Sequence, residues 1–171
     1  TDITEDGDLR EDTFRSLPPS TASPYILQDG DILLARSGAT VGKSFIYKDS
    51  WGLCCFAGYL IRARARHEIM NHDFLYKCFQ SDFYWKYIGS EQIQATIQNV
   101  SAQKYGSFVI PIPPINEQSD IVRLLAEEEK RIQELMQEAQ KAIDLLKERR
   151  SALISATVTG KIDVRNYISQ I

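Results

Sequence analysis

The sequence predicts an α+β fold, in which a compact mixed β/α domain is followed by one long projecting helix that forms an antiparallel coiled coil. Three observations predict it. Short runs of β-branched and aromatic residues alternate with Gly, Asp and Ser turns from about residue 25 to 61. A helical pattern follows at 71–88. From 117 to 156 there is no Pro or Gly, and apolar residues recur every seven positions.

Turn-forming and helix-capping residues predict where the elements of the mixed domain begin and end. The first 24 residues are polar, acidic and rich in Pro and Ser, so we expect turns and loop there. Strands are expected at 31–36, 44–47 and 54–61, and a last strand at 107–110 ends at Pro111. Ser101 is expected to cap a short helical turn, and Asn71 to cap the helix at 71–88. One face of that helix is expected to be buried, through Phe74, Leu75, Cys78, Phe79 and Phe83.

The long helix is expected to extend for about 60 Å, at 1.5 Å per residue. A domain of about 115 residues is only about 30 Å across, so the helix should project and need other helices to cover its apolar face. The alternative is two helices with a break in the charged run at 127–131, although nothing there breaks a helix. Gly160 is a plausible stop.

Heptad positions predict how this helix pairs. Charged residues interrupt the d positions at Glu128 and Arg149. An antiparallel pair places each Glu128 near the other chain's Arg149, whereas a parallel pair sets like charges together. We therefore expect a homodimer, and expect the excess width of the stripe to dock other subunits. The helix-pairing and docking residues are Leu125, Ile132, Leu135, Met136, Ala139, Ile143, Leu146 and Leu153.

Composition bounds the function. The net charge is −3, but residues 1–20 carry −4, residues 21–119 carry +1, and the remainder is neutral, so the overall sign says little about partners. There is no apolar run of membrane-spanning length, no signal segment and no disulfide framework among the three cysteines. We expect a cytoplasmic protein without a membrane partner.

Two motifs fail on inspection. The run Gly38–Ser44 resembles a phosphate-binding P-loop, but it is one residue short, since Ser37 stands where the first glycine should be. Strand residues follow it, so we expect a tight turn rather than a nucleotide site. His67 and His72 are five positions apart and cannot share a metal ion on one helix, so no metal site is expected. No catalytic pair stands out, and no chemistry is expected of this chain.

Two stretches are candidates for nucleic-acid contact. Alternation on a strand would place Arg62, Arg64 and Arg66 on one face, and with Lys43 these residues are candidate phosphate contacts. The alternative is a solvated strand edge. The polar segment, residues 89–104, is rich in amides, which can bridge the edge of adenine. Its alternative is an ordinary polar loop. Its candidate residues are Gln92, Gln94, Thr96, Gln98 and Asn99.

Four segments in this order resemble the specificity subunit of type I restriction–modification systems: 30–43, 96–101, 110–118, and 146–154 with 157–162. They read GDILLARSGATVGK, TIQNVS, IPIPPINEQ, and LKERRSALI with TVTGKI. They are spread over most of the chain, from about residue 25 to about residue 165, and the four together are more specific than any one alone.

The resemblance implies a target recognition domain at 1–114 that lacks its first strands, a conserved spacer helix at 115–157 and a C-terminal tail at 158–171. It implies binding to double-stranded DNA, docking of methylation subunits that carry S-adenosylmethionine, and recruitment of restriction subunits. The chain itself would hold no cofactor. Such subunits are similar to two units in tandem, so we expect half of one, either cut out or natural. The competing interpretation is a coiled-coil scaffold or adaptor whose globular domain binds protein or peptide.

Overall fold

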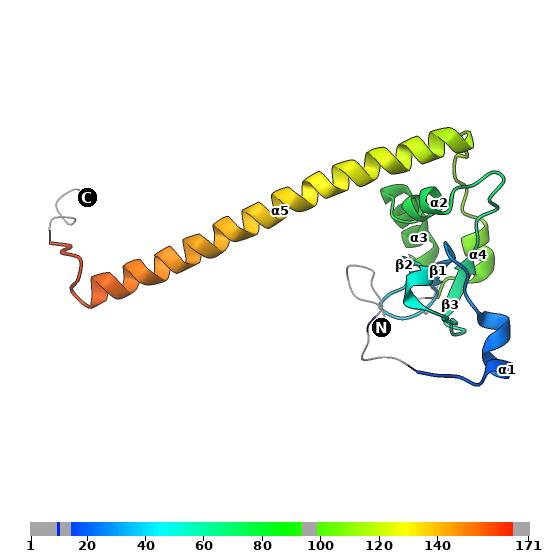
Figure 1. Ribbon diagram of the computed structural model, residues 1–171, viewed down its shortest axis with the longest axis horizontal. Helices are drawn as coiled ribbons and strands as arrows, with labels where there is room; N and C mark the ends of the chain where they lie inside the picture. The colour runs from blue at the N-terminus through cyan, green and yellow to red at the C-terminus, as the bar shows by residue number, and fades with distance from the viewer. Residues whose placement is uncertain (1–9, 11–14, 94–98, 166–171) are drawn as a thin grey trace. The chain divides into compact units, whose positions relative to one another are not determined.

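The computed structural model describes residue 10, residues 15–93 and residues 99–165. The chain divides into two compact units, Thr1–Arg123, hereafter the mixed domain, and Leu124–Ile171. The mixed domain holds a small sheet with short helices, and the long helix α5 (Ile115–Val158) runs from it into the second unit (Figure 1). The predicted fold class, a mixed α/β domain with one long C-terminal helix, is confirmed.

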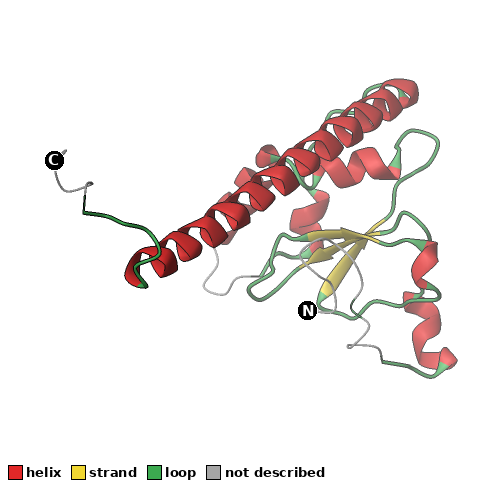
Figure 2. Ribbon diagram, turned by 60° about the vertical axis from the view of Figure 1, so that its left-hand side comes forward, coloured by secondary structure: helices red, strands yellow, loops and turns green. Residues whose placement is uncertain are grey.

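The sheet has three antiparallel strands in the order β2–β1–β3, shown in yellow in Figure 2. β1 (Ile32–Ala35) lies in the middle and is buried throughout, because it pairs on both sides. β2 (Ser44–Ile46) and β3 (Leu60–Ala63) form the edges. The sequence predicted the first two strands within a residue or two.

β1 separates two apolar clusters, as the period of two in a strand requires. Ile32 and Leu34 face the larger cluster, which includes Phe74, Tyr84, Ile88, Val100 and Tyr105. Leu33 faces a smaller cluster with Leu27 and Tyr47. The larger cluster joins the sheet to the helices, and the smaller one is closed by loops and η3 (Asp49–Trp51).

The expected strand at 54–61 is wrong in extent. A turn intervenes, in which the Leu60 amide donates to the Ala57 carbonyl at 2.9 Å, so the ladder of β3 starts only at Leu60. Cys55 instead forms an isolated bridge with Ile26. The expectation of turns and loop before residue 25 is wrong only in part: residues 15–18 are loop, but α1 (Pro19–Ala22) and a 3₁₀ turn, η2 (Ser23–Tyr25), follow. Pro19 is the first residue of α1 and Pro24 the second residue of η2, positions where the missing proline amide costs no intrahelical hydrogen bond.

The expected helix at 71–88 is two helices, α2 (His72–Cys78) and α3 (Asp82–Ile93). Ser81 causes the break, because its hydroxyl donates to the Cys78 carbonyl at 2.7 Å and accepts the Tyr84 amide at 3.2 Å. The break changes the helical phase, so Phe83 is 60% exposed whereas Tyr84 is fully buried, contrary to the expected face.

Both predicted caps are confirmed. The Asn71 side chain accepts the amides of Asp73 and Phe74 at 2.8 and 3.2 Å. Ser101 accepts the Lys104 amide and begins α4 (Ala102–Gly106). The expected strand at 107–110 is wrong: this segment is not paired, and Phe108 is held by its ring contacts with Phe79, Phe83, Tyr84 and Tyr87.

α5 is one unbroken helix, as Figure 1 shows, so the alternative of a break at 127–131 is wrong. It ends as predicted near Gly160, whose φ is 73°. The Lys161 amide donates to the Ala156 carbonyl and the Gly160 amide to that of Thr157, the bonding pattern of a Schellman cap.

Candidate nucleic-acid interface

The glycine turn, Gly38–Gly42, connects β1 to β2. Ala35 bonds across it twice, donating to the Lys43 carbonyl and accepting the Gly42 amide, both at 3.0 Å. The φ angles of Gly38 and Gly42 are 81° and 87°, which L side chains rarely adopt. The tight turn predicted here is confirmed, and a strand rather than a helix follows it, so the geometry of a P-loop is absent.

Gly42 has a second reason to be glycine. A Cβ there would lie 2.8 Å from the Trp85 ring and 3.0 Å from the Ile88 side chain. The first distance is shorter than real Cβ contacts and the second is tighter than most of them, so the absence of a side chain at residue 42 allows α3 its close approach to the turn. A Cβ on Gly38 would meet nothing within 4 Å.

Two tyrosine hydroxyls fix the ends of this hairpin connection. Tyr84 donates to the Gly42 carbonyl and Tyr105 to the Ala35 carbonyl, both at 2.7 Å. Burial raises the pKa of each phenol, so both remain neutral donors. The turn is therefore held from α3 and from α4, which makes it a rigid platform.

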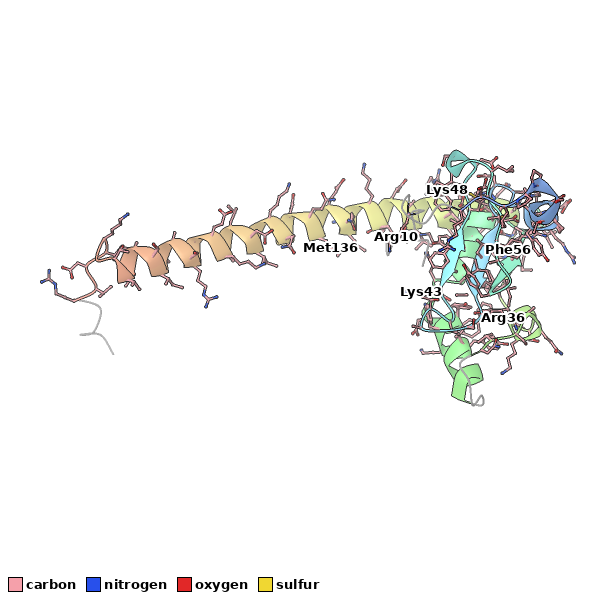
Figure 3. All side chains as sticks on the ribbon, turned by 90° about the horizontal axis from the view of Figure 1, so that it is seen from below. Arg10, Arg36, Lys43, Lys48, Phe56 and Met136 are labelled. Carbon is pink, nitrogen blue, oxygen red and sulfur yellow. The ribbon has the colours of Figure 1, made fainter. Side chains whose placement is uncertain are left out.

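Residues 99 and 100 of the polar segment lie beside the residues that precede the glycine turn. Ser37 and Asn99 form an antiparallel bridge, and the Val100 amide donates to the Arg36 carbonyl at 2.8 Å. Val100 is fully buried and anchors this part of the polar segment. Ser37, Lys43 and Asn99 are exposed, so two segments singled out separately in the sequence lie side by side at one surface. Figure 3 labels Arg36 and Lys43, which lie on either side of the glycine turn.

The remaining candidates of the polar segment are not placed. Gln94, Thr96 and Gln98 lie outside the described residues. Gln92 lies in the last turn of α3, with its backbone alone described. Their contacts with bases stay predictions.

The three arginines do not form the expected strand stripe, because β3 ends at Ala63. Arg64 makes a bidentate ion pair with Asp31, with both nitrogen–oxygen distances 2.6 Å. Arg62 lies over the Phe56 ring at 5.3 Å and donates to the Ile26 carbonyl. Arg66 is exposed. Phosphate contacts by these residues stay a prediction, and Arg64 already has a structural role.

The buried partner of Arg64 was missed in the sequence. Burial of Asp31 raises its pKa, but hydrogen bonds from Arg64 and the Gln28 amide outweigh this and hold the pKa below its ordinary value. Asp31 therefore remains ionised at the start of β1. The signal available in the sequence was a single acid directly preceding an apolar run.

The histidines and cysteines do not assemble a site. His67 and His72 contact each other edge to face, with ring centroids 6.5 Å apart, and the three cysteines are half-buried thiols. Within residues 15–93 and 99–165, no three His, Cys, Asp or Glu side chains are grouped to hold a metal ion. In the same ranges no helix is apolar and long enough to cross a membrane.

The predicted helix-pairing residues form an apolar stripe along α5. The exposed fractions of the seven larger side chains range from 37% at Leu125 to 63% at Leu146. The apolar stripe consists of Leu125, Ile132, Leu135, Met136, Ala139, Ile143, Leu146 and Leu153, all exposed in the isolated chain.

Comparison with known families decides what kind of domain this is. The profile described as "Type I restriction modification DNA specificity domain" matches residues 10–148, which is most of the chain. The chain belongs to this family. This is a family of DNA-recognition domains that are generally non-catalytic, and the resemblance seen in the sequence is confirmed.

Two solved structures are similar to this DNA specificity domain. One belongs to work described as "Structural basis underlying complex assembly and conformational transition of the type I R-M system", with TM-score 0.64, 21% identity and 77% of this chain covered. The other is the HsdS subunit from Thermoanaerobacter tengcongensis, with TM-score 0.53, 23% identity and 71% covered. The match spans 31% and 32% of those two chains, and it shows a shared fold. No curated protein matches the sequence.

Substituting Gly42 with Ala should destabilise the domain by about 2–4 kcal/mol, because strain at positive φ adds to overpacking against Trp85 and Ile88. The matched control is Gly38→Ala, which has the same sign of φ but open space, and should cost only about 1 kcal/mol. Urea unfolding followed by tryptophan fluorescence measures both. Equal losses for the two variants would show that the close approach of α3 is unimportant.

Replacing Arg64 with Met should cost about 2–4 kcal/mol at pH 7, because it leaves the buried Asp31 carboxylate unpaired while Arg64 itself is partly solvent-exposed. In the wild type, the pKa of Asp31 is lower in the folded than in the unfolded state. The stability that ionised Asp31 contributes is therefore fully present above the unfolded pKa of about 3.9, and it is lost as the pH falls through the folded pKa. The difference between the two proteins should therefore narrow below about pH 4. Arg66→Met, an exposed arginine, is the control. A loss of equal size at pH 7 and 3.5 contradicts the assignment.

Proposed function

We propose that this domain reads one half of a bipartite duplex DNA target for a type I restriction–modification complex. The observation that carries the proposal is the bridge between Ser37 and Asn99, which joins the glycine turn to the polar segment at one exposed surface. Family membership favours DNA over the peptide partner of an adaptor.

The two halves of this surface suit different parts of a duplex. The glycine turn is rigid and carries Lys43 at its end, which suits a phosphate contact that positions the domain without reading sequence. The polar segment supplies amides that match the donor and acceptor pattern of adenine in the major groove. Because the turn is held by Tyr84 and Tyr105, little ordering is needed on binding.

Charge supports a small number of phosphate contacts rather than a broad basic face. Residues 21–119 carry a net charge of only +1. Two arginines of this region, Arg62 and Arg64, are already held by contacts within the domain. Affinity for DNA of arbitrary sequence should therefore be weak, and discrimination should come from base contacts.

The second part of the proposal concerns α5. Its apolar stripe is wider than one two-helix seam needs, since Met136 and Ile143 at e positions widen it. We place one copy of the same helix, antiparallel, on the a and d positions, and helices of methylation subunits on the rest. S-adenosylmethionine and the chemistry then belong to those subunits, restriction subunits join the assembly, and the complex acts in the cytoplasm.

Binding to duplex DNA should weaken linearly in a log–log plot against salt, and Lys43→Ala should lower the slope by about one on every sequence. Lys48→Ala is the matched control, because it removes the same charge at the other end of β2 and lies over the Trp51 ring. Asn99→Ala should instead cost about 1–3 kcal/mol on the preferred sequence alone. Fluorescence anisotropy measures the binding. If Lys43→Ala and Lys48→Ala change the salt slope equally, the assignment of a phosphate contact to Lys43 is wrong.

The isolated chain should be a dimer at tens of micromolar, held by the apolar stripe of α5. Ile132→Asp and Leu146→Asp should each produce monomers, because a carboxylate buried in the seam has no partner. Gln133→Asp, also on α5, is the control and should leave the dimer intact. Sedimentation equilibrium measures all four proteins. A wild-type monomer would remove self-association and leave docking to other subunits.

A further inference from the structure

Gln118 is a fully buried amide at the start of α5, and all of its side-chain hydrogen-bonding atoms are engaged. Its Oε1 accepts the Asn71 amide at 2.8 Å. Its Nε2 donates to the Ile69 carbonyl at 2.9 Å and to the Pro113 carbonyl at 2.7 Å. One side chain thus joins α5 to the turn before α2 and to the proline connector, residues 111–114.

These bonds have a direction that the neighbouring apolar contacts lack. Ile121 and Val122 are half-buried against the large cluster of the mixed domain, and such contacts tolerate sliding and small rotations. An amide that must offer one acceptor and two donors to three fixed groups tolerates neither. The first two turns of α5 are therefore held in one rotational setting by Gln118.

Gln118 also stands in phase with the apolar stripe. It precedes Leu125 by seven residues, so it occupies the preceding a position, and Ile121 and Val122 occupy the preceding d and e positions. A heptad drifts by only about 20° on a straight helix. The face of α5 that the mixed domain covers at residues 118–122 is thus the same face that continues as the stripe.

We infer that Gln118 is a positioning residue that fixes the rotation of α5 where the helix leaves the mixed domain, and thereby sets the gap between the two DNA half-sites. The inference rests on the proposed function. A slip of one residue turns a helix by about 100°, which would point the stripe, and the partner helix on it, in another direction. Half-sites are read at a fixed spacing along a duplex that repeats every 34–36 Å. If α5 could rotate freely about its axis, the protein would accept several gaps between the half-sites.

The test is selection of duplexes from a random pool by the full chain, followed by sequencing. Wild type should select two inverted half-sites at one gap. Gln118→Met, which keeps the length but loses all three bonds, should select the same half-sites over a spread of several gaps. Gln133→Met, an exposed glutamine on α5, is the control and should select the wild-type gap. A single unchanged gap for Gln118→Met overturns the inference while the proposed function stands.

A second variant covers the case in which Gln118→Met does not fold, as judged by circular dichroism. In Gln118→Glu, an ionised carboxylate faces the carbonyl oxygens of Ile69 and Pro113, whereas a protonated one can donate to one of them. Its gap distribution should be broad at pH 8 and narrow toward the wild-type gap at pH 5. The same gap at both pH values contradicts the inference. No selected sequence with any variant, wild type included, would instead refute the proposed function.

Discussion

The central strand β1 is the element on which the rest of the mixed domain depends. Its four residues are buried and pair with strands on both sides, so its backbone is available to other segments mainly at its two ends. At its start, Asp31 holds Arg64. At its end, the carbonyls of Ala35 and Arg36 accept Tyr105 and Val100. A strand that cannot shift therefore fixes the glycine turn and the return of the polar segment together.

This arrangement explains how a weakly charged domain can be a DNA reader. In the proposed function, the rigid backbone of the glycine turn would position a phosphate contact, and the segment beside it would read bases. The helix α5 is also divided: its first two turns belong to the mixed domain, and the remainder carries the apolar stripe. A buried amide, Gln118, joins the start of α5 to the turn before α2 and to Pro113 through directional hydrogen bonds.

The sequence predicted those features that depend on local chemistry. The caps at Asn71 and Ser101, the positive-φ turn, the long helix and its Schellman stop all follow from residue types within a few positions. It failed at Ser81, whose bonds to residues three positions away break a well-patterned helix. It also failed where the contacts come from far along the chain, as at Phe108, which is held by rings rather than by a strand partner. The sequence proposed Lys43 and Asn99 as DNA contacts, and these stay predictions. It did not predict the tyrosines that hold the turn or the ion pair that engages Arg64, because their partners lie more than 30 residues away.

The central claim is that the glycine turn and the end of the polar segment form one DNA-contacting surface. Hydrogen–deuterium exchange of the chain, with and without its selected duplex at low salt, tests this most directly. The account predicts slower exchange at residues 36–43 and 91–100 on binding, and unchanged exchange at 49–60, beyond the other end of β2. Slower exchange confined to 49–60, or none in the mixed domain at saturating DNA, would contradict it.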